Sequence, residues 1–116
     1  VIESMDDRKT LINAYKQRKI IGGVFKVIST ANGRYLLDSA ADLQARQNAF
    51  NFSISTNNLF DYKMRKDWQE FGAAAFTFEV LDSLEKKETQ SQEQFIDDLK
   101  TLEQIWAEKL DAAKRY

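Results

Sequence analysis

The chain has 116 residues and a mass of 13.5 kDa, enough for one domain with a single hydrophobic core. Its hydrophobic fraction of 43% and charged fraction of 30% are ordinary for a soluble globular protein. No apolar run approaches the ~20 residues that a membrane span requires, which excludes an integral membrane protein. The formal net charge of −1 gives no support for broad phosphate neutralisation, although it leaves room for a local basic patch.

The absence of two residue types narrows the chemistry. Without cysteine there are no disulfides, thiolate metal sites or cysteine nucleophiles. Without histidine the commonest general base and the commonest zinc ligand are missing. Any catalysis would rest on Tyr, Lys, Arg and carboxylates, with a hard metal such as magnesium if one is needed. The lack of cysteine and of a recognisable secretory signal favours a cytoplasmic location.

The first half of the chain predicts a helix followed by a hairpin. Helical spacing predicts a helix over residues 6–19, within an N-terminal segment (1–21) that precedes a single globular unit (22–116). Two apolar runs, Val24 to Ile28 and Tyr35 to Leu37, flank Asn32-Gly33, which suits a tight turn. Both faces of the first run are apolar, so we expect this strand to be central or covered on both sides.

The second half predicts helices around one further strand. We expect a short helix over 39–50 with Ser39 as its N-cap, a loop over 51–58, and a helix over 59–71 that ends at Gly72. A strand follows over 76–81, then a loop, and the longest helix spans 91–116 with one apolar stripe. The predicted fold class is α+β, a small three-stranded and mostly antiparallel sheet flanked by helices.

Several short segments follow one another in a recognisable order and spacing between about Gly22 and Leu110. They are Gly23-Val24-Phe25, the interval through Asn32-Gly33 to Leu36-Leu37-Asp38, Asp42-Leu43-Gln44-Ala45-Arg46, Lys66-Asp67-Trp68, the strand residues 76–81, and Leu102-Glu103-Gln104-Ile105-Trp106. With the order of elements, these segments resemble the GIY-YIG nuclease family. The resemblance implies an endonuclease-like fold that acts on phosphodiesters.

The resemblance also assigns roles to individual positions. In the family, tyrosines lie beside the attacking water, an arginine contacts the scissile phosphate and a glutamate holds a divalent ion. The arginine and the glutamate correspond to Arg46 and Glu103, which makes them the candidate catalytic residues and makes Glu103 the candidate ligand of Mg²⁺. The two tyrosine positions hold Phe25 and Leu36, which cannot exchange a proton.

Two further family positions are also changed. Asp38 stands where the second motif has glycine, and Phe50 stands where a basic residue or histidine is usual. Tyr35 comes one residue early and should point to the opposite face of its strand. Asp38 could add a second metal-binding carboxylate beside Glu103, or could simply cap a turn.

Charged residues allow structural interpretations too. Arg46 and Glu103 could form an ion pair across a shallow groove without any catalytic role. Lys63, Arg65 and Lys66 form a dense basic cluster that could bind nucleic acid or could be a solvated helix face.

Three functions follow as hypotheses. The first is a catalytically impaired nuclease fold that binds nucleic acid, such as DNA, or a protein. The second is an active metal-dependent nuclease with rearranged chemistry that uses Glu103, Asp38, Arg46 and Tyr35. It predicts that the carboxylates of Asp38 and Glu103 converge. The third is an interaction module that oligomerises through Phe95, Trp106 and the last helix. The nuclease-like hypotheses predict that Phe25, Leu36, Arg46 and Glu103 line one pocket.

Overall fold

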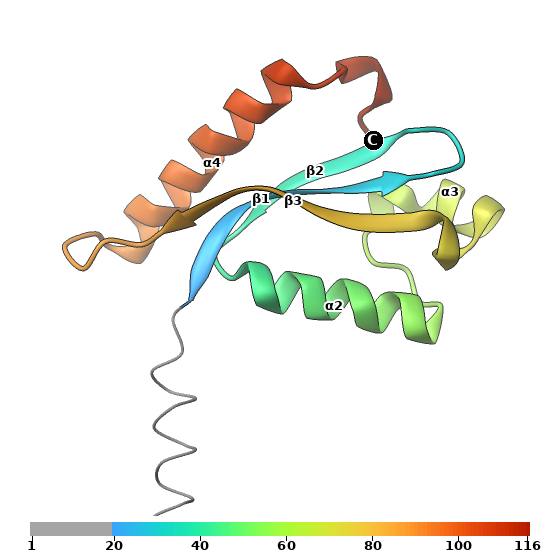
Figure 1. Ribbon diagram of the computed structural model, residues 1–116, viewed down its shortest axis with the longest axis horizontal. Coiled ribbons are helices and arrows are strands. Elements are labelled where there is room, and N and C mark those ends of the chain that lie inside the picture. The colour runs from blue at the N-terminus through green and yellow to red at the C-terminus, as the bar shows by residue number, and fades with distance from the viewer. Residues whose placement is uncertain (1–19) are drawn as a thin grey trace, which may run out of the picture.

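The structure is a computed structural model that describes residues 20–116, so the helix expected over 6–19 lies outside the described residues. Three strands form one antiparallel sheet in the order β2-β1-β3, and helices flank it (Figure 1). The elements are β1 (Ile21–Ser29), β2 (Tyr35–Ala40), α2 (Leu43–Thr56), α3 (Arg65–Phe71), β3 (Phe76–Glu85) and α4 (Gln92–Lys109), with 3-10 turns at Tyr62–Met64, Ala73–Ala75 and Ala112–Lys114. The predicted α+β class is confirmed. Within the described part, no helix has the length and apolar character needed to cross a membrane.

The predicted hairpin is present. β1 and β2 pair antiparallel, with Phe25 opposite Asp38. The turn between them closes where the Gly33 N–H donates to the Ser29 carbonyl at 2.8 Å, and Gly33 has a φ of 74°. Asn32 keeps a negative φ, and its Oδ1 accepts from the Arg34 N–H at 3.0 Å. Gly33 alone therefore supplies the left-handed conformation.

β1 is the central strand, and it is buried on both faces as expected. Phe25 and Val27 pack with Leu36 against α2 and α3, whereas Val24 packs with Leu37 against α4. Side chains alternate along a strand, so these two clusters lie on opposite sides of the sheet. Figure 1 shows α2 and α4 on these two sides. We call them the α2 face and the α4 face.

The bounds predicted for the helix after the hairpin are wrong. Ser39 pairs with Val24 as a strand residue, and Asp42 is the N-cap because its side chain accepts from the Ala45 N–H at 3.1 Å. The helix also continues through most of the polar run predicted as a loop. Its hydroxyls find partners inside the helix, as when Thr56 Oγ1 donates to the Phe52 carbonyl at 2.7 Å. The helix ends only at Asn57, whose φ is 55°.

After α2, the α-helix is shorter and the strand is longer than the sequence predicted. The Asp61 side chain accepts from the Lys63 N–H at 2.9 Å and starts a 3-10 turn, which leads into α3. Gly72 ends α3 with a φ of 81°, as predicted. β3 continues to Glu85 instead of ending at residue 81, because it pairs with the whole of β1 across a bulge in the register.

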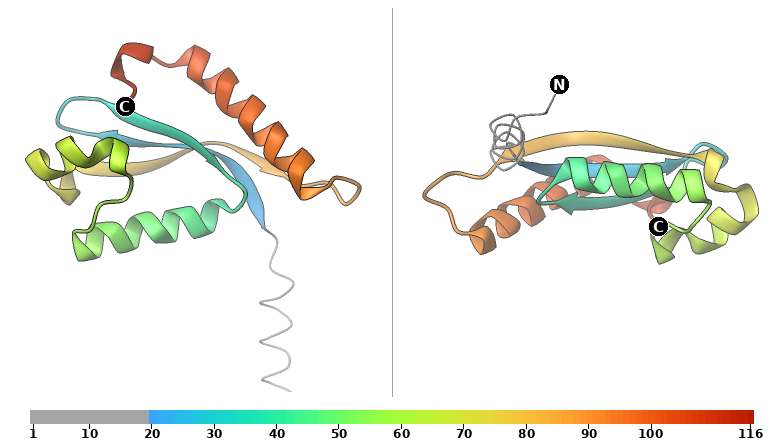
Figure 2. Two further views of the ribbon diagram at one scale, coloured as in Figure 1. Left: turned by 180° about the vertical axis from the view of Figure 1, so that it is seen from behind. Right: turned by 90° about the horizontal axis from the view of Figure 1, so that it is seen from below.

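α4 begins at a complete capping box between Ser91 and Gln94, but it does not continue to residue 116. The helix ends at Lys109, and the chain then turns back along the sheet. Residues 111–116, here called the C-terminal strap, run beside β2, where Arg115 forms a parallel bridge with Tyr35. Figure 2 shows the C-terminus next to β2 in a second view. The strap thus covers part of an otherwise open sheet edge.

Candidate functional site

Phe25 and Leu36, the two positions that the resemblance aligns with the family's tyrosines, belong to the hydrophobic core. Phe25 is 0% exposed and Leu36 is 2% exposed, both on the α2 face. The Phe25 ring stacks on Phe78 with centroids 4.7 Å apart, and Phe50 also approaches Phe78 at 5.7 Å. The side chains at the tyrosine positions and at the basic or histidine position are therefore packing groups. None of the three carries a proton that could be exchanged at neutral pH.

Arg46 lies above this part of the core. Its guanidinium is 4.4 Å from the centroid of the Phe60 ring and 5.9 Å from that of Phe25. A cation over an aromatic face is attracted by the ring quadrupole, so these contacts hold the side chain in place. Within residues 20–116 the Arg46 guanidinium forms no ion pair. Its charge is oriented by the rings and is not neutralised by any carboxylate of the described residues.

Glu103 does not share this surface. It comes from α4, between Leu102 and Trp106, which both pack on the α4 face. Its Oε2 lies 4.0 Å from Nη2 of Arg115, and its Oε1 is buried without a hydrogen-bond partner in the part of the chain that the structure describes. The expected pocket that joins Glu103 to Phe25, Leu36 and Arg46 is therefore not formed. An ion pair between Arg46 and Glu103 is also excluded, because Glu103 pairs with the strap.

Asp38 stands between Leu36 and Ala40 on β2, and both neighbours pack on the α2 face. Its Oδ1 accepts a hydrogen bond from the Ser39 N–H at 2.8 Å, which is a local role. Because Asp38 and Glu103 project on opposite sides of the sheet, the convergence expected for an active two-carboxylate site does not occur. Across residues 20–116, no group of three or more Asp or Glu side chains is arranged to hold a metal ion.

Tyr35 points away from Leu36, as the alternation of a strand requires. It is 4% exposed on the α4 face, and its hydroxyl donates to the Asp111 carbonyl at 2.9 Å. This hydroxyl therefore fastens the strap to β2. It does not reach the α2 face, where Arg46 lies.

The predicted basic cluster is exposed on the 3-10 turn and the start of α3. Lys63, Arg65 and Lys66 all point to solvent. Tyr62, beside them, is 77% exposed, which is unusual for an aromatic side chain. The underlying residues of this segment, Met64 and Trp68, pack into the cluster of the α2 face. The basic cluster and Arg46 therefore belong to the same side of the sheet.

A polar network around Asp67 was not expected from the sequence. Asp67 is 5% exposed, and its Oδ2 accepts hydrogen bonds from Asn32 Nδ2 at 2.8 Å and from the Tyr116 hydroxyl. The pKa of Asp67 is lowered, chiefly by the hydrogen bond from Tyr116. Desolvation by burial acts in the opposite direction, and the Asn32 hydrogen bond and the charges of Arg34 and Lys66 lower the pKa further. Burial, and then Asp67 itself, raise the pKa of Tyr116. The sequence singled out the segment Lys66-Asp67-Trp68. It could not predict that Asp67 would bond to Asn32 and Tyr116, because these lie 35 and 49 residues away in the chain.

Two residues assigned to an oligomer surface are engaged within the chain. Phe95 is 2% exposed, and Trp106 donates from Nε1 to Asp82 Oδ2 at 3.1 Å. Trp106 also packs with Leu37 and Tyr35 on the α4 face. Both side chains therefore act chiefly as internal packing groups.

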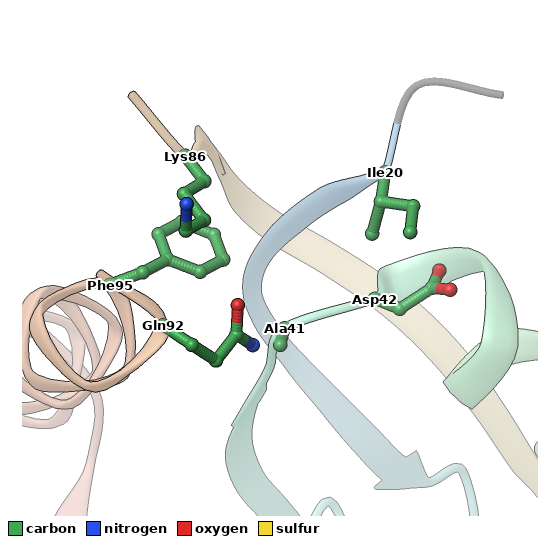
Figure 3. Close-up of a pocket in the computed structure, with 6 residues that line it drawn as sticks. All are labelled: Ile20, Ala41, Asp42, Lys86, Gln92 and Phe95. Atoms are coloured by element: carbon green, nitrogen blue, oxygen red, sulfur yellow. The ribbon is translucent and has the colours of Figure 1, made fainter. Parts of the chain in front are cut away.

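A pocket of about 310 Å³ opens at another place, where the start of α4 approaches the start of β1 (Figure 3). Phe95 and Gln92 line it from one side, and Ile20 and Asp42 from the other. Neither Arg46 nor Glu103 contributes to its wall. This pocket is therefore separate from the positions that the motifs single out.

Comparison with known proteins gives a likeness in structure only. No protein-family model matches the chain, and no curated protein matches it in sequence. Among solved structures, it is similar to the catalytic domain of the intron endonuclease I-TevI carrying a glutamate-to-alanine substitution, with a TM-score of 0.60 and 15% identity over 84% of this chain and 92% of that one. A second structure of the catalytic domain of this homing endonuclease gives a TM-score of 0.56 and 16% identity, over 77% and 87%. I-TevI is a GIY-YIG homing endonuclease, and this chain has the fold of its catalytic domain.

Proposed function

We propose that this protein is a nuclease-fold domain that binds nucleic acid without cutting it. The observation that carries the proposal is the replacement of the two proton-handling positions by buried hydrocarbon beneath an intact arginine. Phe25 and Leu36 are fully packed, and Arg46 lies above Phe25 with its charge unpaired among the described residues.

The chemistry of phosphodiester hydrolysis supports the loss of catalysis. The reaction needs a deprotonated water, a cation on the developing charge and a metal on the leaving oxygen. Removing a general base alone typically costs about 10²- to 10⁴-fold in rate. Glu103, the one retained candidate for holding a metal, projects on the other face of the sheet and pairs with Arg115. Arg46 therefore lacks both of the groups that would make a bound phosphate reactive.

The α2 face supports binding. Arg46 stacks on Phe60. Two residues after Phe60, the chain enters the 3-10 turn where the basic cluster begins. Three exposed cations follow within four residues: Lys63, Arg65 and Lys66. The exposed ring of Tyr62 beside them suits stacking on a base, and cations beside an aromatic ring are typical of surfaces that follow a nucleic-acid backbone. The net charge of the whole chain is −1, so this basic patch is a local concentration of positive charge on a protein that is not basic overall.

The test of binding is fluorescence anisotropy of labelled single-stranded and duplex DNA over a range of salt concentrations. The double variant Lys63→Gln/Lys66→Gln should weaken binding and reduce the slope of log K against log salt by about 0.9 for each lost phosphate contact with duplex. The control Lys87→Gln/Lys100→Gln removes the same charge from exposed positions on the β3–α4 connection and on α4. Equal losses in both variants, or no binding by the wild type, would count against the proposal.

The test of catalysis uses the wild type with Mg²⁺ or Mn²⁺ and plasmid or branched DNA. Both substrates should stay uncut. Metal-dependent cleavage that disappears in Glu103→Ala would show that the site works despite the missing hydroxyls. If DNA does not bind but a protein partner is captured, the scaffold serves a protein ligand instead.

A further inference from the structure

The C-terminal strap joins the two faces of the domain across the edge of β2. On the α4 face it begins at Asp111, whose carbonyl accepts from the Tyr35 hydroxyl at 2.9 Å. Along the edge, the Tyr116 N–H donates to the Tyr35 carbonyl at 2.8 Å. At its end, the Tyr116 hydroxyl donates to Asp67 of α3, which belongs to the α2 face. The strap is thus held at both of its ends.

Charged contacts add to this attachment. Lys114 Nζ donates to the Asn32 carbonyl at 3.3 Å, and the Arg34 guanidinium lies 4.8 Å from the centroid of the Tyr116 ring. Both Asn32 and Arg34 come from the β1–β2 turn. The strap therefore has a defined position, and that position determines where Arg115 points.

Arg115 is directed at Glu103. Its Nη2 donates to the Leu37 carbonyl at 3.4 Å and lies 4.0 Å from Glu103 Oε2. The Glu103 side chain is only 16% exposed, and that of Arg115 is 37% exposed. A carboxylate this far from solvent needs a positive partner, and the guanidinium provides it.

Glu103 in this arrangement does not fit a divalent ion. Magnesium prefers an octahedral shell of oxygens and keeps several of its waters, so it requires a carboxylate oxygen that solvent can reach. Glu103 Oε2 faces a guanidinium, and Oε1 is buried with no partner. Across the described residues there is no cluster of acidic side chains that would complete a site.

We propose that Arg115 is the resident cation of Glu103, and that the C-terminal strap excludes divalent ions from this carboxylate. The guanidinium and a divalent ion compete for the same carboxylate, and the position of the strap places the guanidinium beside Oε2. Removing the Arg115 charge leaves this largely buried carboxylate without its cation, so a divalent ion should be attracted to it in place of the guanidinium. This inference concerns the ion bound at Glu103, and it holds whether or not the protein binds nucleic acid.

The experiment titrates the full chain with Mn²⁺ and follows paramagnetic broadening of backbone amide signals in NMR spectra. The wild type should show no selective broadening around residues 102–106. Arg115→Ala should gain broadening there, with Mn²⁺ binding at least tenfold tighter. Arg115→Ala/Glu103→Gln should lose that gain. Arg115→Lys, which keeps a cation on the strap, should behave like the wild type.

A second variant separates opening of the site from general damage to the fold. Arg115→Met keeps an apolar stem and removes the charge, so it should gain the same Mn²⁺ site with an otherwise unchanged spectrum. Selective broadening around Glu103 in the wild type would overturn the proposal. So would a failure of both charge-removing variants to gain a site.

Discussion

The Tyr116 hydroxyl donates a hydrogen bond to the buried carboxylate of Asp67, and this contact joins the C-terminal strap to α3. The two residues are 49 positions apart in the sequence. The strap that carries Tyr116 runs along the edge of β2, where Arg115 bridges to Tyr35. The stability of the domain and the accessibility of Glu103 therefore depend on the same few contacts.

Tyr116→Phe should destabilise the domain. The substitution keeps the ring under Arg34 and removes only the hydroxyl, which leaves the buried Asp67 with fewer donors. Losing a hydrogen bond to a charged group costs about 1.5–3 kcal/mol, which urea denaturation would measure. Tyr62→Phe is the matched control, because that ring is 77% exposed and its loss of a hydroxyl should change little. Equal stability of Tyr116→Phe and wild type would argue against a native contact with Asp67.

Low pH should weaken the hydrogen bond between Tyr116 and Asp67. The pKa of Asp67 is lowered in the folded state, first by the Tyr116 hydrogen bond, so the folded protein favours the ionised carboxylate. This contribution is complete above the unfolded-state pKa of about 3.9, and it is lost as the pH falls through the lower folded value. The stability difference between wild type and Asp67→Asn should therefore shrink as the pH drops from 5 towards 2. Urea midpoints measured at each pH would reveal it, and a constant difference would contradict the assignment.

High pH should weaken the contribution of Tyr116 to the stability of the fold. The pKa of Tyr116 is raised by burial and by Asp67, so the folded state favours the protonated phenol. Its contribution is complete below the unfolded-state pKa of about 10, and it is lost as the pH rises beyond that value towards the raised one. Wild type should lose stability relative to Tyr116→Phe above this pH. Parallel curves for the two proteins in alkali would exclude the mechanism.

Adding a hydroxyl to the ring at position 25 should harm the fold without creating activity. In Phe25→Tyr the new hydroxyl would lie in a core where the ring is 0% exposed and stacks on Phe78. Burying a hydroxyl without a partner costs about 1–3 kcal/mol. Phe52→Tyr is the control, since Phe52 is 64% exposed. Thermal unfolding and a plasmid-cleavage assay would test both parts, and cleavage by Phe25→Tyr would mean that the hydroxyl alone had been missing.

Gly23, the first residue of the first motif, should be required for packing. A Cβ on Gly23 would lie 2.1 Å from the Asp82 carbonyl oxygen of β3, so β1 and β3 would have to separate. Gly23→Ala should cost about 3 kcal/mol or fail to fold. The comparison is Gly33→Ala, where no atom lies within 4 Å and the cost of about 1–2 kcal/mol comes from the positive φ alone. A fully stable Gly23→Ala would contradict the close approach of these strands.

Local patterns in the sequence predicted the hairpin, the central strand buried on both faces and the apolar stripe of α4. Each depends on residues close together in the chain, such as Asn32-Gly33 at the turn or Phe95 and Leu99 on one side of a helix. The end of α2 was missed because its polar side chains bond within the helix, as Thr56 does, and so resemble a loop. The extension of β3 was missed because its residues after Leu81 are strand only through pairing with β1.

The candidate site was predicted residue by residue, but its geometry was not. The sequence by itself determined that the tyrosine positions carry hydrocarbon, because side-chain chemistry needs no fold to be known. Only the tertiary structure decided that Arg46 and Glu103 lie on opposite faces, because that depends on which side of the sheet each helix packs. It also decided that Arg115 pairs with Glu103, because a contact between a helix and a returning strap leaves no periodic pattern in the chain.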